Sequence, residues 1–410
     1  MRSVAEHLAA VLDGVRPVPP LDVVLADAAG CVLAEDVTAE GDIPALARAG
    51  CDGYAVRSAD VRDGVELPVL DDAPVTASGP MRLVPGTAIL VAAGAPLPVG
   101  ADAVVPRDRT DRGRAHVVVR GVSRSGEHVR VVGQDAAADQ VVLRRGTRVA
   151  ARHLTVAAAV GRSRLWVHPS PRVVVVTVGD ELVEPGRRLT GGATHDALGV
   201  AMVAAAKDAG TTAQRVGPVP DDRGRLRETL ADQVVRADVV VLTGGLSGGP
   251  WDGVADVLAP LGTVRFDEVG LTPGRRNGFG TVPAGVDVDA VDPVGGCLLF
   301  ALPGHPVAAL TSFEMFVRPA LRAMAGYTSL YRPSVTAVAG RGWHSPAGLR
   351  QVVPVVVTGS PKDGYQVRPV ADPDQVSIAA YAGANALAVV PEQTTTVRAG
   401  DPVTCMVLES

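Results

Sequence analysis

The chain has 410 residues and a formal net charge of −5, with 47% hydrophobic but only 3% aromatic residues. This length predicts roughly two to four domains, with cores built mainly from Val, Leu and Ala. The slightly acidic balance excludes a strong overall attraction to nucleic acid, so no nucleic-acid partner is expected.

The cysteines and the first helix indicate the compartment. Cys31, Cys51, Cys297 and Cys405 are scattered without a CxxC or Cys/His spacing, which fits neither a zinc site nor a disulfide scaffold. We therefore expect a reducing compartment and a cytoplasmic location. Residues 1–15 predict a charged amphipathic helix rather than a signal peptide. No helical stretch approaches the roughly 18 apolar residues of a membrane span, so no membrane partner is expected.

Patterns along the chain predict an α/β multidomain protein. Residues 1–50 continue from the helix into short apolar segments, and residues 138–170 return to a strand and an alanine-rich helix. Together these two segments predict a split helical and strand N-terminal region. Residues 51–137 hold short β runs separated by Gly and Pro, which is typical of an inserted all-β domain. Residues 171–326 predict an α/β domain, and residues 327–410 a small C-terminal β barrel or sandwich.

The segment 171–326 alternates apolar strands with helices. The runs in PRVVVVTVGDEL, DVVVLTGG and CLLFALPG predict buried strands, and helical patterns of about 10 to 15 residues occur between them. This alternation indicates βαβ units and a doubly wound parallel sheet with helices on both faces. Ligands bind at the carboxyl ends of the strands in this architecture, so the loops after these strands form the candidate site.

The loop DVVVLTGGLSGGPWD is the most informative of these. Its strand ends in a glycine-rich turn, which exposes backbone N–H groups where phosphate or another anion can bind. The alternative is a tight βα turn that binds nothing. A hydroxyl at Ser247 and a carboxylate at Asp252 favour a binding site, because a purely structural turn requires neither. The turn contains Thr243, Gly244 and Gly245, then Ser247, Gly248 and Gly249, and then Asp252.

Two further loops should converge on the same edge. Asp180 and Glu181 follow one buried strand, and Pro303, Gly304 and His305 follow another. Backbone donors beside carboxylates suit a phosphorylated substrate held with a divalent ion such as Mg²⁺. The two carboxylates could instead be a solvated loop or a helix cap. For His305 we favour a packed turn histidine over a catalytic base.

The order and spacing of these pieces resemble the molybdopterin molybdenumtransferases, the MoeA/gephyrin E-domain family of molybdenum cofactor synthesis. The resemblance covers essentially the whole chain. It is carried by segments 50–56 (GCDGYAV), 93–105 (AGAPLPVGADAVV), 130–135 (RVVGQD), 177–182 (TVGDEL), 243–252 (TGGLSGGPWD), 302–306 (LPGHP) and 384–392 (ANALAVVPE).

The resemblance implies a fold, a reaction and partners. It implies a MogA-like α/β domain that binds the pterin, an elongated N-terminal region and a homodimer in which the β domain of the partner subunit completes the cleft. It also implies transfer of molybdenum from molybdate to adenylated molybdopterin, with Mg²⁺-dependent release of AMP.

Site residues follow from the resemblance position by position. Asp52 matches an acidic residue that reaches the cleft from the partner subunit. Glu181 and Asp252 match pterin-site carboxylates suited to Mg²⁺ coordination, and with Asp52 they are the candidate catalytic residues. The candidate substrate-binding residues are Thr243, Gly244, Gly245, Ser247, Gly249, Pro273, Gly274, Arg275, Pro303, Gly304, His305 and Arg350.

This sequence departs from the family pattern in its cationic positions. The family's KPGKP segment is replaced by Thr272-Pro273-Gly274-Arg275-Arg276, and a further lysine of some members aligns with Glu268. Loss of one lysine and gain of Glu268 should weaken oxyanion binding, although the two arginines can compensate. The other departures are Ala93, Ala197, His305 and Asp374-Gln375.

Three functions are therefore weighed. The first is an active molybdenumtransferase. The second is a diverged, non-catalytic paralogue that binds molybdopterin or a partner enzyme. The third, a nucleotide-dependent enzyme with a Rossmann turn, is disfavoured because GGLSGG lacks the GxGxxG spacing.

Overall fold

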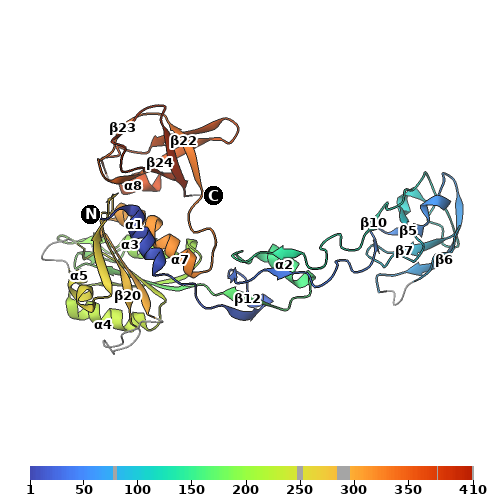
Figure 1. Ribbon diagram of the computed structural model, residues 1–410, viewed down its shortest axis with the longest axis horizontal. Helices are drawn as coiled ribbons and strands as arrows, with labels where there is room; N and C mark the ends of the chain where they lie inside the picture. The colour runs from blue at the N-terminus through green and yellow to red at the C-terminus, as the bar shows by residue number, and fades with distance from the viewer. Residues whose placement is uncertain (77–80, 247–252, 284–295, 376, 409–410) are drawn as a thin grey trace.

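The computed structural model describes residues 1–76, 81–246, 253–283, 296–375 and 377–408. Figure 1 shows an elongated molecule with an α/β unit and a β barrel together at one end. A narrow middle region around α2 and β12 connects them to a separate β unit at the other end. No helix in the described ranges is long and apolar enough to cross a membrane.

The α/β unit contains one six-stranded sheet. Its order is β16 (Thr212–Val219), β13 (Arg172–Val178), β17 (Val239–Thr243), β21 (Cys297–Leu302), β20 (Arg276–Val282) and β18 (Val264–Glu268). The first four strands are parallel, with Val173 opposite Val239 and Val239 opposite Leu298. The last two form an antiparallel hairpin at the edge, so the expected parallel sheet is mixed there. Valine-rich strands suit this sheet because both of its faces are covered.

Helices cover both faces of the sheet, as a doubly wound fold requires. One face packs against α1 (Val4–Asp13), α3 (Leu198–Asp208), α6 (Pro306–Ser312), η5 (Phe313–Val317) and α7 (Arg318–Met324). The other face packs against α4 (Arg223–Val234) and α5 (Gly253–Leu258). Alternate strand residues serve the two cores: Val173 and Val175 face the first, and Val174 and Val176 the second. The period of two along each strand explains this division.

The entry helix α1 belongs to this α/β packing. Ser3 and Glu6 form a capping box at its start, which satisfies free N–H groups there. Val11 and Val15 then join the core cluster under the sheet. The first residues of the chain are thus close to the last helices of the α/β unit, although they precede the middle region in the sequence.

The C-terminal strands close into a barrel, which confirms the prediction for this part of the chain. The barrel strands are β24 (Arg350–Ser360), β25 (Gly364–Pro369), β22 (Ser334–Ala339), β28 (Pro402–Val407) and β26 (Ala386–Val390), and β26 pairs back to β24. The short pair β23 (Trp343–His344) and β27 (Thr396–Val397) and helix α8 (Ile378–Ala382) complete this unit. One further strand, β19 (Leu271–Thr272), comes from the α/β unit and pairs with β24.

Two further parts of the molecule are the middle region and the distal β unit. The distal sheet has the order β8 (Ala103–Pro106), β5 (Gly53–Val56), β7 (Ala88–Val91), β6 (Glu66–Ala73) and β9 (His116–Val118). The middle region contains α2 (Ala151–Ala159), β1 (Leu21–Val24), β2 (Val32–Leu33), β3 (Val37–Thr38), β11 (Val141–Leu143) and β12 (Arg164–His168). The pair β4 (Arg48–Ala49) and β10 (Val129–Arg130) leads to the distal unit.

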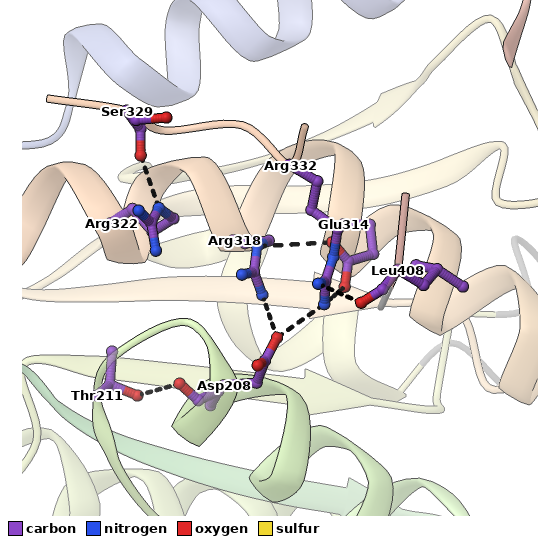
Figure 2. A network of polar contacts seen from close by, with 9 residues as sticks. Asp208, Thr211, Glu314, Arg318, Arg322, Ser329, Arg332 and Leu408 are labelled. Carbon is purple, nitrogen blue, oxygen red and sulfur yellow. Dashed lines mark hydrogen bonds and ion pairs between the residues drawn. The ribbon is translucent and has the colours of Figure 1, made fainter. Parts of the chain in front are cut away.

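A polar network fastens the barrel to the α/β unit (Figure 2). Arg332, in the segment that enters the barrel, donates to Glu314 of η5 at 2.8 and 2.9 Å and to Asp208 of α3 at 2.8 Å. It also donates to the carbonyl of Leu408 after the last barrel strand, at 2.8 Å. Arg318 donates to Asp208 at 2.7 Å from the other side. Burial raises the pKa of Asp208, but the two guanidinium groups outweigh this effect and hold it below its ordinary value.

Candidate functional site

A cavity of about 110 Å³ opens at the carboxyl ends of the central parallel strands. Its lining includes Glu181 after β13, Thr243 and Gly244 at the end of β17, and Gly304 and Pro306 after β21. The three loops that sequence reasoning selected therefore meet at one place. This is the position at which ligands bind in doubly wound sheets.

Two glycines bring the loops into direct contact. Gly244 has a φ of 92°, and a Cβ built on it would lie 2.2 Å from the carbonyl oxygen of Val178. A Cβ on Gly304 would lie 3.3 Å from the Cα of Gly244. Only glycine allows this backbone approach. The floor of the cavity is consequently backbone, and one buried polar side chain of the lining has no hydrogen-bond partner among the described residues.

That side chain is Thr243. It is 1% exposed, and its Oγ1 has no hydrogen-bond partner among the described residues. A buried hydroxyl without a partner costs about 1 to 3 kcal/mol unless a ligand or water satisfies it. Since Thr243 lines the cavity, it is suited to bond a polar group of a bound molecule.

The next residues of the glycine loop are described only in part. Gly245 has a φ of 64°, and its Cβ would lie 2.6 Å from Cγ2 of Val254, so this glycine is required by packing against α5. Ser247, Gly249 and Asp252 lie outside the described residues.

The two neighbouring carboxylates differ in position. Glu181 lines the cavity, and its side chain curls over Gly179, where an added Cβ would be 2.5 Å from Oε2. Asp180 accepts the backbone N–H of Asp221 at 3.1 Å instead, and is not among the cavity residues. The geometry therefore favours the solvated-loop interpretation for Asp180 and leaves Glu181 as the candidate ligand.

Asp196 is a cavity residue that sequence reasoning did not select. It is 1% exposed, and it accepts bonds from the Thr177 hydroxyl at 2.7 Å and from the Gly199 amide at 2.8 Å. Arg215 lies 3.5 Å away. The available signal was an Asp immediately before the apolar helix α3, which is a helix-start pattern. Asp196 shapes the cavity wall by joining the end of β13 to the start of α3.

A second group of predicted residues lies in residues 268–276, which we call the basic loop. Gly274 has a φ of 113° and packs on α6, where an added Cβ would be 2.6 Å from Oγ of Ser312. The side chain of Arg275 is 58% exposed, and its Nε lies 3.9 Å from the Glu268 carboxylate. Glu268, which departs from the family pattern, therefore partly neutralises the positive charge of Arg275, the arginine that could compensate for the departure.

The basic loop also approaches the barrel. Pro273 lines a small cavity with Val307 of α6 and with Val352 and Gln375 of the barrel unit. Arg350 is opposite Leu271 in the β19–β24 pair and is bonded to Glu392 at 3.1 Å. Because Pro306 lines the first cavity and Val307 the second, the first turn of α6 separates them.

The predictions for Pro303 and His305, in the turn after β21, receive different support. Pro303 follows β21 directly, in the turn that brings Gly304 to the cavity. His305 is the exposed residue before α6 and makes no side-chain capping bond. It is not part of the cavity lining. The structure therefore gives His305 no catalytic contact within the described residues.

Asp52 directly precedes β5 of the distal β unit, which lies at the opposite end of the molecule from the α/β unit (Figure 1). Its Oδ1 accepts the backbone N–H of Ala93 at 2.7 Å. Because the donor is the amide, the Thr-to-Ala departure at this position leaves the bond in place. Asp52 also lines a separate cavity of about 320 Å³ with Asp72 and Arg107. A single chain does not bring Asp52 to Glu181.

Comparisons with known proteins cover nearly the whole chain. Family models match residues 2–161 (MoeA N-terminal region, domains I and II), 174–323 (probable molybdopterin binding domain) and 336–408 (MoeA C-terminal region, domain IV). The chain is similar to two Mycobacterium tuberculosis H37Rv proteins, molybdopterin molybdenumtransferase 2 (34% identity over 411 residues) and molybdopterin molybdenumtransferase 1 (36% over 427 residues). Each match covers 98% of both chains. A solved structure of a molybdopterin biosynthesis MoeA protein from Pyrococcus horikoshii OT3 has a TM-score of 0.78 at 25% identity, covering 99% of this chain and 100% of that one.

Proposed function

The chain belongs to the MoeA family of molybdopterin molybdenumtransferases, and we propose that it inserts molybdenum from molybdate into adenylated molybdopterin with release of AMP. The family acts in molybdenum cofactor biosynthesis. The observation that carries the proposal is the cavity formed by Glu181, Thr243, Gly244 and Gly304 at the carboxyl edge of the sheet.

The cavity suits the phosphate end of the pterin substrate. Its glycine floor lets a ligand approach the backbone, where N–H groups can bond anionic oxygens. The Thr243 hydroxyl, which has no partner among the residues that the structure describes, adds a donor within this floor. Ser247, Gly249 and Asp252 are proposed to complete the anion site from the adjacent loop, and His305 and Pro303 to border it.

Glu181 is proposed as a ligand of the Mg²⁺ that the family implies. Mg²⁺ commonly takes one or two protein carboxylates and completes its shell with substrate phosphates and water. Glu181 fits this requirement because it is exposed at the cavity, whereas Asp196 already accepts bonds from Thr177 and Gly199. Asp252 is proposed as the second carboxylate. Bound Mg²⁺ would offset charge on the phosphate that leaves as AMP.

Molybdate is proposed to bind beside the basic loop. Arg275 follows Pro273 and Gly274 in the basic loop, Arg350 begins β24, which pairs with β19 of the same loop, and Gly274 lets the loop lie close to α6. Charge-assisted bonds from guanidinium groups suit a dianion. Glu268 opposes this attraction, because its carboxylate lies 3.9 Å from Arg275.

A homodimer is proposed because Asp52 belongs to the same predicted site but directly precedes β5 of the distal β unit, at the other end of the molecule from the α/β unit. Presentation of the distal β unit to the α/β unit of a second copy would bring Asp52 to the cleft. The four cysteines are free, which supports a cytoplasmic location.

Complementation tests the proposed function. The gene for this chain is expressed in a bacterial strain that lacks its own molybdenumtransferase, and nitrate reductase activity is measured over a range of molybdate concentrations. Rescue at ordinary molybdate supports the enzyme. A soluble protein that gives no rescue even at high molybdate would favour the non-catalytic paralogue, for which the Glu268–Arg275 pair is the motivating observation.

A further inference from the structure

The basic loop leaves the α/β sheet, contributes one strand to the barrel sheet and returns to the α/β sheet. Strand β18 ends at Glu268 and β20 begins at Arg276, so both ends of the loop are held by the edge hairpin of the α/β sheet. Between them, β19 joins the barrel sheet, and the Arg350 amide donates to Gly270 at 2.7 Å. The hairpin alone therefore does not determine the conformation of the loop.

Arg2 fastens the loop on its other side. Its backbone N–H donates to the Glu268 carbonyl at 2.7 Å, and its carbonyl accepts the Gly270 amide at 2.8 Å. Its guanidinium donates to Asp267 at 2.9 Å. This ion pair is partly buried, with the Arg2 and Asp267 side chains 27% and 18% exposed. Charge-assisted bonds of this kind are stronger than neutral ones.

The contacts continue from Arg2 to Arg275 through one residue. Val269 lies opposite Arg2 in a parallel bridge, and its own amide donates to the Arg275 carbonyl at 2.7 Å. Val269 is fully buried. Displacement of the chain segment at Arg2 would therefore release the backbone that carries the Arg275 side chain.

We propose that Arg2 is a positioning residue for molybdate binding by Arg275. The inference rests on the function proposed above. Arg2 does not touch the oxyanion; its guanidinium is anchored on Asp267 of β18 while its backbone bonds Glu268 and Gly270, so that it holds the basic loop that carries Arg275. None of the residues that Arg2 contacts lines the pterin cavity, so pterin binding does not depend on it.

The test compares Arg2→Ala with Arg2→Lys, which keeps a cation. Arg16→Ala is the matched control. Arg2 precedes helix α1 and Arg16 follows it, and among the described residues the Arg16 side chain bonds only the nearby carbonyls of Asp13 and Val15. In Arg2→Ala we expect the half-saturating molybdate concentration to rise about five- to tenfold. The half-saturating concentration of adenylated molybdopterin should stay unchanged. Arg2→Lys should recover part of the loss, and Arg16→Ala should match the wild type.

Two further measurements separate this inference from its premise. Hydrogen exchange should accelerate at the Gly270 and Leu271 amides in Arg2→Ala but not in Arg16→Ala. The effects of Arg2→Ala and Arg275→Ala on the half-saturating molybdate concentration should also be non-additive, because both act through the Arg275 side chain. If Arg275→Ala impairs molybdate use but Arg2→Ala leaves it unchanged, or the two effects simply add, the positioning role is wrong. If Arg275→Ala itself has no effect, the molybdate site proposed above fails instead, and the inference with it.

Discussion

Arg332 donates to both carboxylate oxygens of Glu314, at 2.8 and 2.9 Å, across the junction between the barrel and the α/β unit (Figure 2). Glu314 is 7% exposed, and Arg318 is its other cationic neighbour, at 3.8 Å. This pair lies where the chain leaves the α/β unit. It therefore helps to hold the barrel, which carries Arg350, against the α/β unit, in addition to the direct pairing of Arg350 with Leu271.

Removal of one member of this pair should destabilise the protein strongly. We expect Arg332→Ala to lower the free energy of unfolding by about 3 to 5 kcal/mol, because it leaves the buried Glu314 carboxylate with a weaker partner. The measurement is urea denaturation. Arg341→Ala is the control, since Arg341 bonds only the carbonyl of Ala371 on the exposed barrel surface. A loss in Arg332→Ala no larger than in the control would show that the network contributes little.

The contact between Gly304 and Gly244 should control the size of the pterin cavity. In Gly304→Ala the added Cβ would lie 3.3 Å from the Gly244 Cα, so the two loops must separate slightly. We expect molybdopterin affinity to fall about tenfold with little change in stability. Gly253→Ala is the control, because a Cβ there meets no atom of the described residues within 4 Å. Normal affinity in Gly304→Ala would mean that the ligand binds elsewhere.

The neighbouring carboxylates Glu181 and Asp180 should behave differently. Glu181→Gln keeps the side-chain shape but removes the charge proposed to hold Mg²⁺, so AMP release should slow by about tenfold or more. Binding of molybdopterin should change less. Asp180→Asn is a matched control, because Asp180 caps the Asp221 amide outside the cavity. Equal losses of binding and AMP release in Glu181→Gln would remove the metal-site assignment.

The charge of Glu268 should limit molybdate use. Glu268→Gln and Thr272→Lys should each lower the half-saturating molybdate concentration by about three- to tenfold, because each makes the basic loop more positive. Arg265→Ala is the control for a change in net charge on the same hairpin. The Arg265 side chain is 73% exposed and lies near Asp267. Unchanged molybdate dependence in Thr272→Lys, together with an inert Arg275→Ala, would favour the non-catalytic paralogue.

His7 should make stability depend on pH. Burial against Phe316 lowers the pKa of His7, and Asp267 only partly opposes this. The unfolded chain therefore takes up the proton first as pH falls. The contribution of neutral His7 is complete above its ordinary pKa of about 6.5 and is lost as pH falls below it. We expect urea denaturation between pH 7.5 and 5.5 to show a smaller pH dependence in His7→Gln than in the wild type.

Much of the fold could be predicted because burial imposes a local pattern. The valine runs at 173–176 and 239–241 identify strands covered on both faces, and the structure places them side by side in the sheet. The sequence did not predict the antiparallel hairpin of β18 and β20, because neither strand contains such an apolar run. The role of Asp196 was missed because its partner Thr177 is distant in sequence and lies on another strand.

The sequence by itself determined the family, the three loops of the pterin cavity and the altered charges of the basic loop. These properties depend on residue type and spacing, which are local. Only the tertiary structure decided that Asp180 bonds the Asp221 amide outside the cavity, that Glu268 lies 3.9 Å from Arg275, and that Arg2 contacts the basic loop. Each of these contacts depends on how side chains turn or on residues far apart in the chain, and folding brings such groups together only when the whole core is packed.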